Sequence, residues 1–177
     1  MDRRIRPLQR AIPRGRKLKL YFAYGSNLKA ARLRERVGEV AIAGVAALAE
    51  HRLSCGKRGD DGSGKAHCEP LPGGAVWGAL YEISAAQLRT LDRFEPGYRR
   101  AEVELAFASG ARLRALTYRA ERFTDDPVPF DWYKALMVEG AREHNLPAAY
   151  RALLEALPSR PDPRGAHAHT RATEVRR

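Results

Sequence analysis

The chain has 177 residues, of which 44% are hydrophobic, and its formal net charge is +11. That length and hydrophobic content are enough for one compact domain with a sizeable core. No apolar run approaches the roughly 20 residues that a membrane-spanning helix needs, and the N-terminus lacks the apolar core of a secretory signal. We therefore expect a cytoplasmic protein with no membrane as a partner.

The positive charge is concentrated at the two ends of the chain. Residues 1–19 carry a net charge of +7 and residues 159–177 carry +3, which leaves only +1 for residues 20–158. Both ends are rich in Arg and contain no aromatic side chain on which a nucleic-acid base could stack. We expect mobile basic tails over residues 1–18 and 159–177 around a single domain, residues 19–158. We do not expect nucleic acid as a partner.

The first predicted element is a strand over residues 19–24, which are mostly aromatic or apolar. Turn-forming residues follow at 25–27, and a helix-like stretch then runs to about residue 37. A strand, a tight turn and a helix start point several backbone N–H groups at one place, which is how proteins bind carboxylates, phosphates and oxyanions. The turn is therefore a candidate site, although many α/β proteins bind nothing at such a turn.

The next segment, residues 40–53, is a long apolar stretch whose periodicity fits either a helix or a strand. A polar loop over residues 56–64 follows, with Cys55 before it and Cys68 after it. Neither the spacing of the two cysteines nor that of two nearby histidines matches a known zinc pattern. We expect two reduced thiols and no metal site.

The middle of the chain alternates between strand and helix patterns. A strand is predicted over residues 75–83, after a Pro-Gly-Gly turn. Ser84 and Gln87 then form a capping box, which predicts the start of a helix. Two runs that alternate apolar and polar residues, 99–107 and 111–118, predict an antiparallel hairpin. Together these elements indicate a mixed sheet.

Two helices are predicted to close the domain. They cover residues 130–144 and 148–157, and Pro147 begins the second one. The Tyr and Leu side chains of the second helix share one face, so we expect them to lie in the core.

Glu95 is the residue that we expect to carry chemistry. It follows the capped helix and precedes Pro96 and Gly97, so it lies where a helix ends near the sheet. The negative end of the helix dipole and partial burial would both raise its pKa, and a raised pKa suits a general base. A lone Glu is more often a solvated surface residue, so the surrounding motif has to decide between the two interpretations.

Taken in order, several short strings resemble the γ-glutamylcyclotransferase-like (AIG2-like) family over roughly residues 19–157. They are Tyr21-Phe22-Ala23-Tyr24-Gly25-Ser26-Asn27-Leu28, Val76-Trp77-Gly78, Leu91-Asp92 followed by Glu95, Tyr98-Arg99-Arg100, Tyr133, and Gly140-Ala141 followed by Leu146-Pro147. The stretch between Glu95 and Tyr98 is shorter than in many relatives, which bears on the amine specificity. The resemblance implies an α+β fold, a small mixed β-barrel surrounded by helices, and an enzyme that uses no cofactor.

The reaction that the resemblance implies is cyclisation of a small γ-glutamyl amide to 5-oxoproline, with release of an amino acid or amine. The substrate supplies both the nucleophile, its α-amine, and the electrophile, its γ-carbonyl. Glu95 is the expected catalytic residue, which takes a proton from the ammonium and returns it to the leaving nitrogen. The expected substrate-binding residues are Tyr21, Tyr24, Gly25, Ser26, Asn27, Tyr98 and Tyr133.

Several alternatives stay open at this level. The N–H groups of residues 25–27 could bind either the oxyanion or the substrate α-carboxylate. Tyr21 and Tyr24 lie on opposite faces of a strand, and for Tyr21 a place in the core is the better interpretation. The chain could also be a non-catalytic module that binds γ-glutamyl or acidic metabolites, or that contacts nucleic acid through its basic tails. Besides the small substrate, we expect a monomer or a homodimer.

Overall fold

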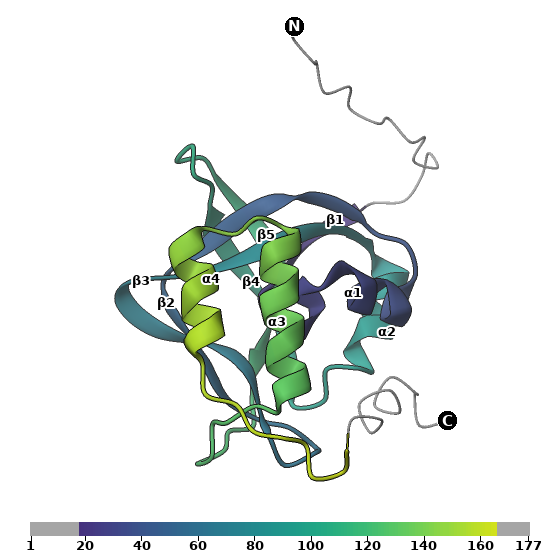
Figure 1. The fold of residues 1–177 in the computed structure, drawn as a ribbon. Helices are drawn as coiled ribbons and strands as arrows, with labels where there is room; N and C mark the ends of the chain where they lie inside the picture. Colours follow the sequence, from purple (N-terminus) through teal and green to yellow (C-terminus); the bar gives the residue numbers. More distant parts are fainter. Residues whose placement is uncertain (1–17, 166–177) are drawn as a thin grey trace, which may run out of the picture.

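Five strands close into a barrel in the computed structural model, which describes residues 18–165 (Figure 1). Around the barrel they follow the order β1-β3-β2-β4-β5. Their bounds are Leu18–Ala23 (β1), Ala41–Arg58 (β2), Gly64–Ser84 (β3), Tyr98–Ala106 (β4) and Arg112–Ala120 (β5). Neighbouring strands are antiparallel except for β1 and β5, which are parallel. The predicted mixed barrel is therefore confirmed.

The strands β2 and β3 form one long antiparallel ladder, so the ambiguous apolar stretch before residue 53 is a strand. The strand expected to start at residue 75, after a turn, in fact starts at Gly64 and runs through the Pro-Gly-Gly segment. Ala49 pairs with Ala75 and His51 with Pro70, so the residues 71–74 bulge out of the ladder. A glycine at φ +73° lies in this bulge. The turn signal thus marks a bulge and not the end of a strand.

A 3-10 turn and four α-helices accompany the barrel in the described part of the chain. They are η1 (Ser26–Leu28), α1 (Ala30–Val37), α2 (Ala85–Asp92), α3 (Asp131–Glu143) and α4 (Ala148–Ala156). The helix expected directly at the first turn therefore begins only at Ala30, after η1. In Figure 1, α3 and α4 lie side by side across one face of the barrel, with α1 and α2 next to them. None of these helices has the length and apolar character needed to cross a membrane.

The capping box at the start of α2 is confirmed. The Ser84 hydroxyl oxygen accepts a hydrogen bond from the Gln87 N–H, and the Gln87 side chain accepts one from the Ser84 N–H. The Gln87 side chain also donates to the Glu39 carbonyl at 2.8 Å, so the start of α2 is tied to the segment between α1 and β2.

Helix α3 packs directly on the turn that follows β1. Gly140 makes this approach possible, because a Cβ atom there would lie 2.5 Å from the Leu28 carbonyl carbon. The Leu28 carbonyl oxygen accepts a hydrogen bond from the Tyr81 hydroxyl at 3.1 Å, and His144 Nε2 lies 2.9 Å from it. The barrel and α3 therefore hold the turn from two sides.

The chain returns to the domain after α4. The Asp131 N–H donates to the Arg160 carbonyl oxygen, and the Arg160 N–H donates to Pro129. The Trp132 indole N–H donates to Asp162 at 3.0 Å. The first residues of the segment that the sequence assigned to a mobile C-terminal tail are thus attached to the domain. The rest of that tail and the basic N-terminal residues 1–17 lie outside the described residues.

Candidate active site

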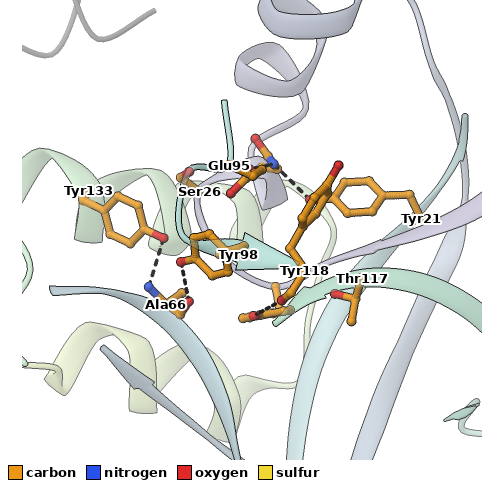
Figure 2. Close-up of a pocket in the computed structure, with 11 residues that line it drawn as sticks. Tyr21, Ser26, Ala66, Glu95, Tyr98, Thr117, Tyr118 and Tyr133 are labelled. Carbon is orange, nitrogen blue, oxygen red and sulfur yellow. Dashed lines mark hydrogen bonds between the residues drawn. The ribbon is translucent and has the colours of Figure 1, made fainter. Parts of the chain in front are cut away.

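A pocket lies between β1, the turn that follows it, β4, β5 and α3 (Figure 2). It holds about 290 Å³ of space, counting its open mouth. The residues that line it are Tyr21, Tyr24, Gly25, Ser26, Asn27, Ala66, Glu95, Tyr98, Thr117, Tyr118 and Tyr133. The structure therefore brings together all the residues that the sequence placed in the site, although they come from distant parts of the chain.

Glu95 is held in the pocket wall by two donors. Asn27 Nδ2 donates to Glu95 Oε1 at 2.8 Å, and Arg36 Nη1 lies 3.1 Å from the same oxygen. Arg36 Nη1 also donates to Asn27 Oδ1 at 2.8 Å, which closes a triangle of three side chains. Within residues 18–165 no donor binds the second carboxylate oxygen, Oε2.

The ion pair in this triangle is nearly enclosed by protein. The Glu95 side chain is 13% exposed and the Arg36 side chain 6%. Burial raises the pKa of Glu95 above its ordinary value, while the charge of Arg36 and the hydrogen bond from Asn27 lower it without cancelling the effect of burial. The raised pKa of Glu95 agrees in direction with the sequence-based expectation, and burial is the largest cause of the rise.

The tyrosines of the pocket are held by main-chain groups. The Tyr98 hydroxyl donates to the Ala66 carbonyl at 2.7 Å, and the Ala66 N–H donates to the Tyr133 hydroxyl at 3.1 Å. Figure 2 shows the two phenols converging on Ala66. The Tyr24 hydroxyl donates to the Tyr118 carbonyl at 2.6 Å. Burial raises the pKa of Tyr133 to about 12 and that of Tyr24 and Tyr98 well above the usual range, so these phenols are neutral at physiological pH.

Tyr21 is buried, as expected, but it also lines the pocket together with Tyr24. Strand alternation predicted that the two side chains would face opposite ways. β1 ends at Ala23, however, so Tyr24 no longer follows that alternation. The Tyr21 hydroxyl accepts a hydrogen bond from Asn27 Nδ2 at 2.9 Å and therefore supports the triangle around Glu95.

The turn after β1 has unbonded backbone donors beside the pocket. Among the residues that the structure describes, no acceptor binds the N–H groups of Gly25, Ser26 and Asn27. Gly25 is tightly enclosed, since a Cβ atom there would lie 3.0 Å from Ala66 Cβ and 3.1 Å from the Tyr133 hydroxyl. Consecutive free N–H groups at the start of a helical turn are suited to bind a negatively charged oxygen.

Four residues of the site were missed from the sequence, one of which is Ala66, whose main chain bonds Tyr98 and Tyr133. Arg36 is one of several arginines in α1, and nothing in the local pattern distinguishes it. Thr117 and Tyr118 belong to the hairpin strand β5, whose alternation predicts a strand but not its place beside a pocket. The Tyr118 hydroxyl donates at 2.8 Å to Asp92, which also pairs with Arg100. Asp92 lies outside the pocket lining and supports the pocket wall through Tyr118.

The chemical groups of the pocket are one carboxylate with its guanidinium partner, phenols, the hydroxyls of Ser26 and Thr117, the Asn27 amide and backbone donors. Between residues 18 and 165 no three His, Cys, Asp or Glu side chains come close enough to hold a metal ion. Cys55 and Cys68 are buried free thiols. Burial raises the pKa of Cys55 to about 11 and that of Cys68 to about 12, so both remain protonated at neutral pH.

Comparison with known proteins identifies the family of the chain. Residues 75–154 match the AIG2-like family. The chain is similar to the γ-glutamylcyclotransferase of Homo sapiens, with 32% identity over 147 residues that cover 78% of each chain, and to that of Bos taurus, with 30% identity and the same coverage. A solved structure of a γ-glutamyl cyclotransferase superposes with a TM-score of 0.76 at 30% identity, covering 81% of this chain and 89% of the other.

With these relatives, the closed barrel and the pocket that holds the glycine turn and the buried carboxylate belong to an AIG2-like enzyme. More particularly, the chain belongs to the γ-glutamylcyclotransferase family, because the identity to a named member extends over more than two thirds of both chains. The resemblance seen in the sequence and the expectation of an enzyme are thereby confirmed.

Proposed function

We propose that this enzyme cyclises the γ-glutamyl group of a small γ-glutamyl amide to 5-oxoproline and releases an amino acid or amine, with Glu95 as general acid and base. The observation that carries the proposal is the state of Glu95 in the pocket. It is buried and has a raised pKa, and one of its carboxylate oxygens is free. The names of the similar proteins support cyclotransfer as the reaction.

Ring closure depends more on the orientation of the substrate than on reactive groups of the protein. The substrate α-amine attacks the γ-carbonyl of the same molecule. A pocket that holds the glutamyl chain folded therefore lowers the entropy cost of bringing these two groups together in the transition state. Well-aligned intramolecular reactions gain up to about 7–11 kcal/mol in this way. We assign substrate binding to the pocket residues Tyr21, Tyr24, Gly25, Ser26, Asn27, Tyr98 and Tyr133.

Proton transfer is the part that we assign to Glu95. Its Oε2 accepts a proton from the α-ammonium, which frees the nucleophile, and returns that proton to the leaving nitrogen. The raised pKa makes the carboxylate a stronger base than an ordinary Glu. Asn27 and Arg36 bind Oε1 only, so they fix the carboxylate while leaving Oε2 for the substrate.

The backbone donors of the turn complete the proposed site. The free N–H groups of residues 25–27 suit either the oxyanion of the tetrahedral intermediate or the substrate α-carboxylate. Loss of one oxyanion donor typically costs about 3–4 kcal/mol in the transition state. The Tyr133 hydroxyl accepts from the Ala66 N–H, so its own O–H can donate to a substrate. The Tyr98 hydroxyl donates to the Ala66 carbonyl and can still accept from a substrate. Both rings also shape the pocket wall and exclude water.

Mass-spectrometric detection of 5-oxoproline tests the proposal. Wild type and Glu95→Gln are incubated with γ-glutamyl amino acids, γ-glutamylamines and glutathione. A matched control is Glu102→Gln, which makes the same change at an exposed position on β4. We expect equal product formation by the wild type and the control, and formation about 10²–10⁴-fold slower by Glu95→Gln. Equal turnover by all three proteins would remove Glu95 as the base, and no product from any of them would reject cyclotransfer on these substrates.

A further inference from the structure

Two cationic side chains beside the pocket are buried without an acidic partner. Arg32 is 8% exposed and Lys57 is 3% exposed. Arg32 Nε has no hydrogen-bond partner in the described part of the chain. No acceptor between residues 18 and 165 binds the Lys57 ammonium, which lies 4.8 Å from the centre of the Tyr98 ring. Of the nitrogen atoms of these two cations only Arg32 Nε is fully enclosed, so their charges are partly desolvated, at a cost that no ion pair in the described part of the chain offsets.

Aromatic rings compensate for only part of that cost. The Arg32 guanidinium lies 5.6 Å from the centre of the Trp132 ring, and the Lys57 ammonium lies over the Tyr98 ring in the same way. Such contacts stabilise a cation electrostatically but leave its N–H donors unbonded. Burial lowers the pKa of Arg32 to about 10, so its guanidinium stays protonated at neutral pH. Both side chains are therefore suited to receive an anionic ligand.

Lys57 lies against the active site and not merely inside the fold. The Tyr98 ring beneath its ammonium lines the pocket, and the charges of Lys57 and Glu95 interact. The turn that joins Glu95 to Tyr98 leaves room for it, because a Cβ atom on Gly97 would lie 3.2 Å from Lys57 Cε. A larger residue at position 97 would push the lysine away from the pocket.

Arg32 reaches the same site from α1. It lies one helical turn before Arg36, on the same face of the helix, and Arg36 is bonded to Glu95. The charge of Arg32 interacts with Glu95 and with the pocket phenol Tyr133. Arg32 and Lys57 are therefore both close to the reacting groups.

Charged side chains of both signs surround the pocket. The positive ones include Arg32, Arg36, Lys57, Lys65 and Arg122, and the negative ones include Glu35, Asp60, Asp61 and Glu95. Arg36 pairs with Glu95, and Lys65 pairs with Asp61 at 2.6 Å. In the described part of the chain Arg32 and Lys57 form no ion pair, because Glu35 and Asp60, whose charges act on them, are exposed and lie beyond ion-pair distance. Two neighbouring cations without an ion pair suit a ligand with two negative charges.

We propose that Arg32 and Lys57 bind the two carboxylates of an acidic leaving amino acid, so that the preferred substrates are γ-glutamylglutamate and γ-glutamylaspartate. This inference rests on the proposed function. One cation binds the α-carboxylate of the leaving half and the other binds its side-chain carboxylate. A γ-glutamylamine has no carboxylate on its leaving half, so it would leave both cations buried and unpaired.

The chemistry of the step is unchanged by this assignment. The bond from the α-nitrogen to the γ-carbon forms and the γ-amide C–N bond breaks. The proton taken from the α-ammonium ends on the nitrogen of the released glutamate or aspartate. The carboxylates held by Arg32 and Lys57 do not react, so these residues determine specificity and are not catalytic.

A pair of nearly isosteric substrates tests the proposal. γ-Glutamylglutamate and γ-glutamylglutamine differ by one carboxylate, and kcat/KM for 5-oxoproline formation is measured for both. We expect the wild type to favour the glutamate peptide by about 10- to 100-fold, as for a charged hydrogen bond. The variant that loses the cation for the α-carboxylate, which both peptides have, should lower kcat/KM for both. The variant that loses the cation for the side-chain carboxylate should lower kcat/KM for the glutamate peptide alone. Arg32→Gln and Lys57→Gln are these two variants. The double variant should show no preference.

The control is Arg114→Gln, which removes the same charge from an exposed position on β5 and should leave the preference unchanged. Wild type that cyclises both peptides equally well would overturn this inference while leaving the proposed function intact. Absence of 5-oxoproline from both peptides and from γ-glutamylalanine would overturn the proposed function, and this inference with it. The comparison of the two peptides with wild-type enzyme needs no variant. It therefore tests the preference for an acidic leaving amino acid even if a substitution impairs folding.

Discussion

Replacing Arg36 by Met tests how the Glu95 carboxylate is held. The substitution keeps an unbranched apolar side chain near the Phe94 ring but removes the guanidinium 3.1 Å from Glu95 Oε1 and 2.8 Å from Asn27 Oδ1. Because both members of the ion pair are nearly enclosed, Glu95 would remain buried without its charge partner. We expect the free energy of unfolding to fall by about 3–5 kcal/mol at neutral pH.

The size of this loss depends on pH. Burial raises the pKa of Glu95 above its ordinary value of 4.5, and Arg36 is the strongest influence that opposes burial, so the variant's pKa is higher still. Between the unfolded and folded pKa values the folded state holds a proton that the unfolded state releases, and stability therefore falls as pH rises. The deficit of Arg36→Met relative to wild type should be smallest at low pH, where Glu95 is protonated in both folded proteins, and should grow once the pH exceeds the raised pKa of Glu95 in wild type.

Urea denaturation of both proteins over a range of pH measures this deficit. The acid limb of kcat/KM should also move to higher pH in the variant, because a higher pKa leaves less of Glu95 ionised. The control is Arg89→Met, at an exposed position on α2, which should change neither quantity. A stability deficit that is the same at every pH would refute the argument that ionisation of Glu95 causes it.

Two further substitutions separate the support of the site from the stability of the fold. In Gly140→Ala the new Cβ atom would lie 2.5 Å from the Leu28 carbonyl carbon and 2.6 Å from the Lys29 nitrogen, so the turn must shift. Urea denaturation should show a loss of about 1–3 kcal/mol, and kcat/KM should fall at least about tenfold; an unchanged kcat/KM would contradict this. Ser84→Ala removes the capping box with Gln87 and should cost about 1 kcal/mol. Its kcat/KM should stay at the wild-type value, and a marked decrease would show that α2 does more than support the fold.

The local elements of this fold follow from local signals. The capping box at Ser84 and the turn at Ser109-Gly110 act within a few residues, so the start of α2 and the β4–β5 hairpin were predicted correctly. Barrel closure depends instead on the parallel pairing of β1 with β5, at Tyr21 and Leu116. No periodicity connects such distant segments, and only the family resemblance predicted the barrel.

Some residues of the candidate site were also predicted from local sequence, and others were not. The motif residues, which include Gly25, Asn27 and Glu95, were found because their strings resemble those of the γ-glutamylcyclotransferase-like family. Arg36, Arg32 and Lys57 were missed because they are ordinary cations in a chain with many of them. Their roles depend on the packing of α1 and β2 around the pocket. The face of Tyr21 was misjudged because β1 ends one residue before Tyr24.

The pH profile of 5-oxoproline formation by wild type and Glu95→Gln tests the central claim most directly. The account predicts that wild-type kcat/KM falls on the acid side with an apparent pKa above 4.5, the ordinary value for Glu. Folded Glu95→Gln should be about 10²–10⁴-fold slower and should lack that acid limb. A Glu95→Gln enzyme that keeps both the wild-type rate and the acid limb would contradict the assignment of Glu95 as the general base.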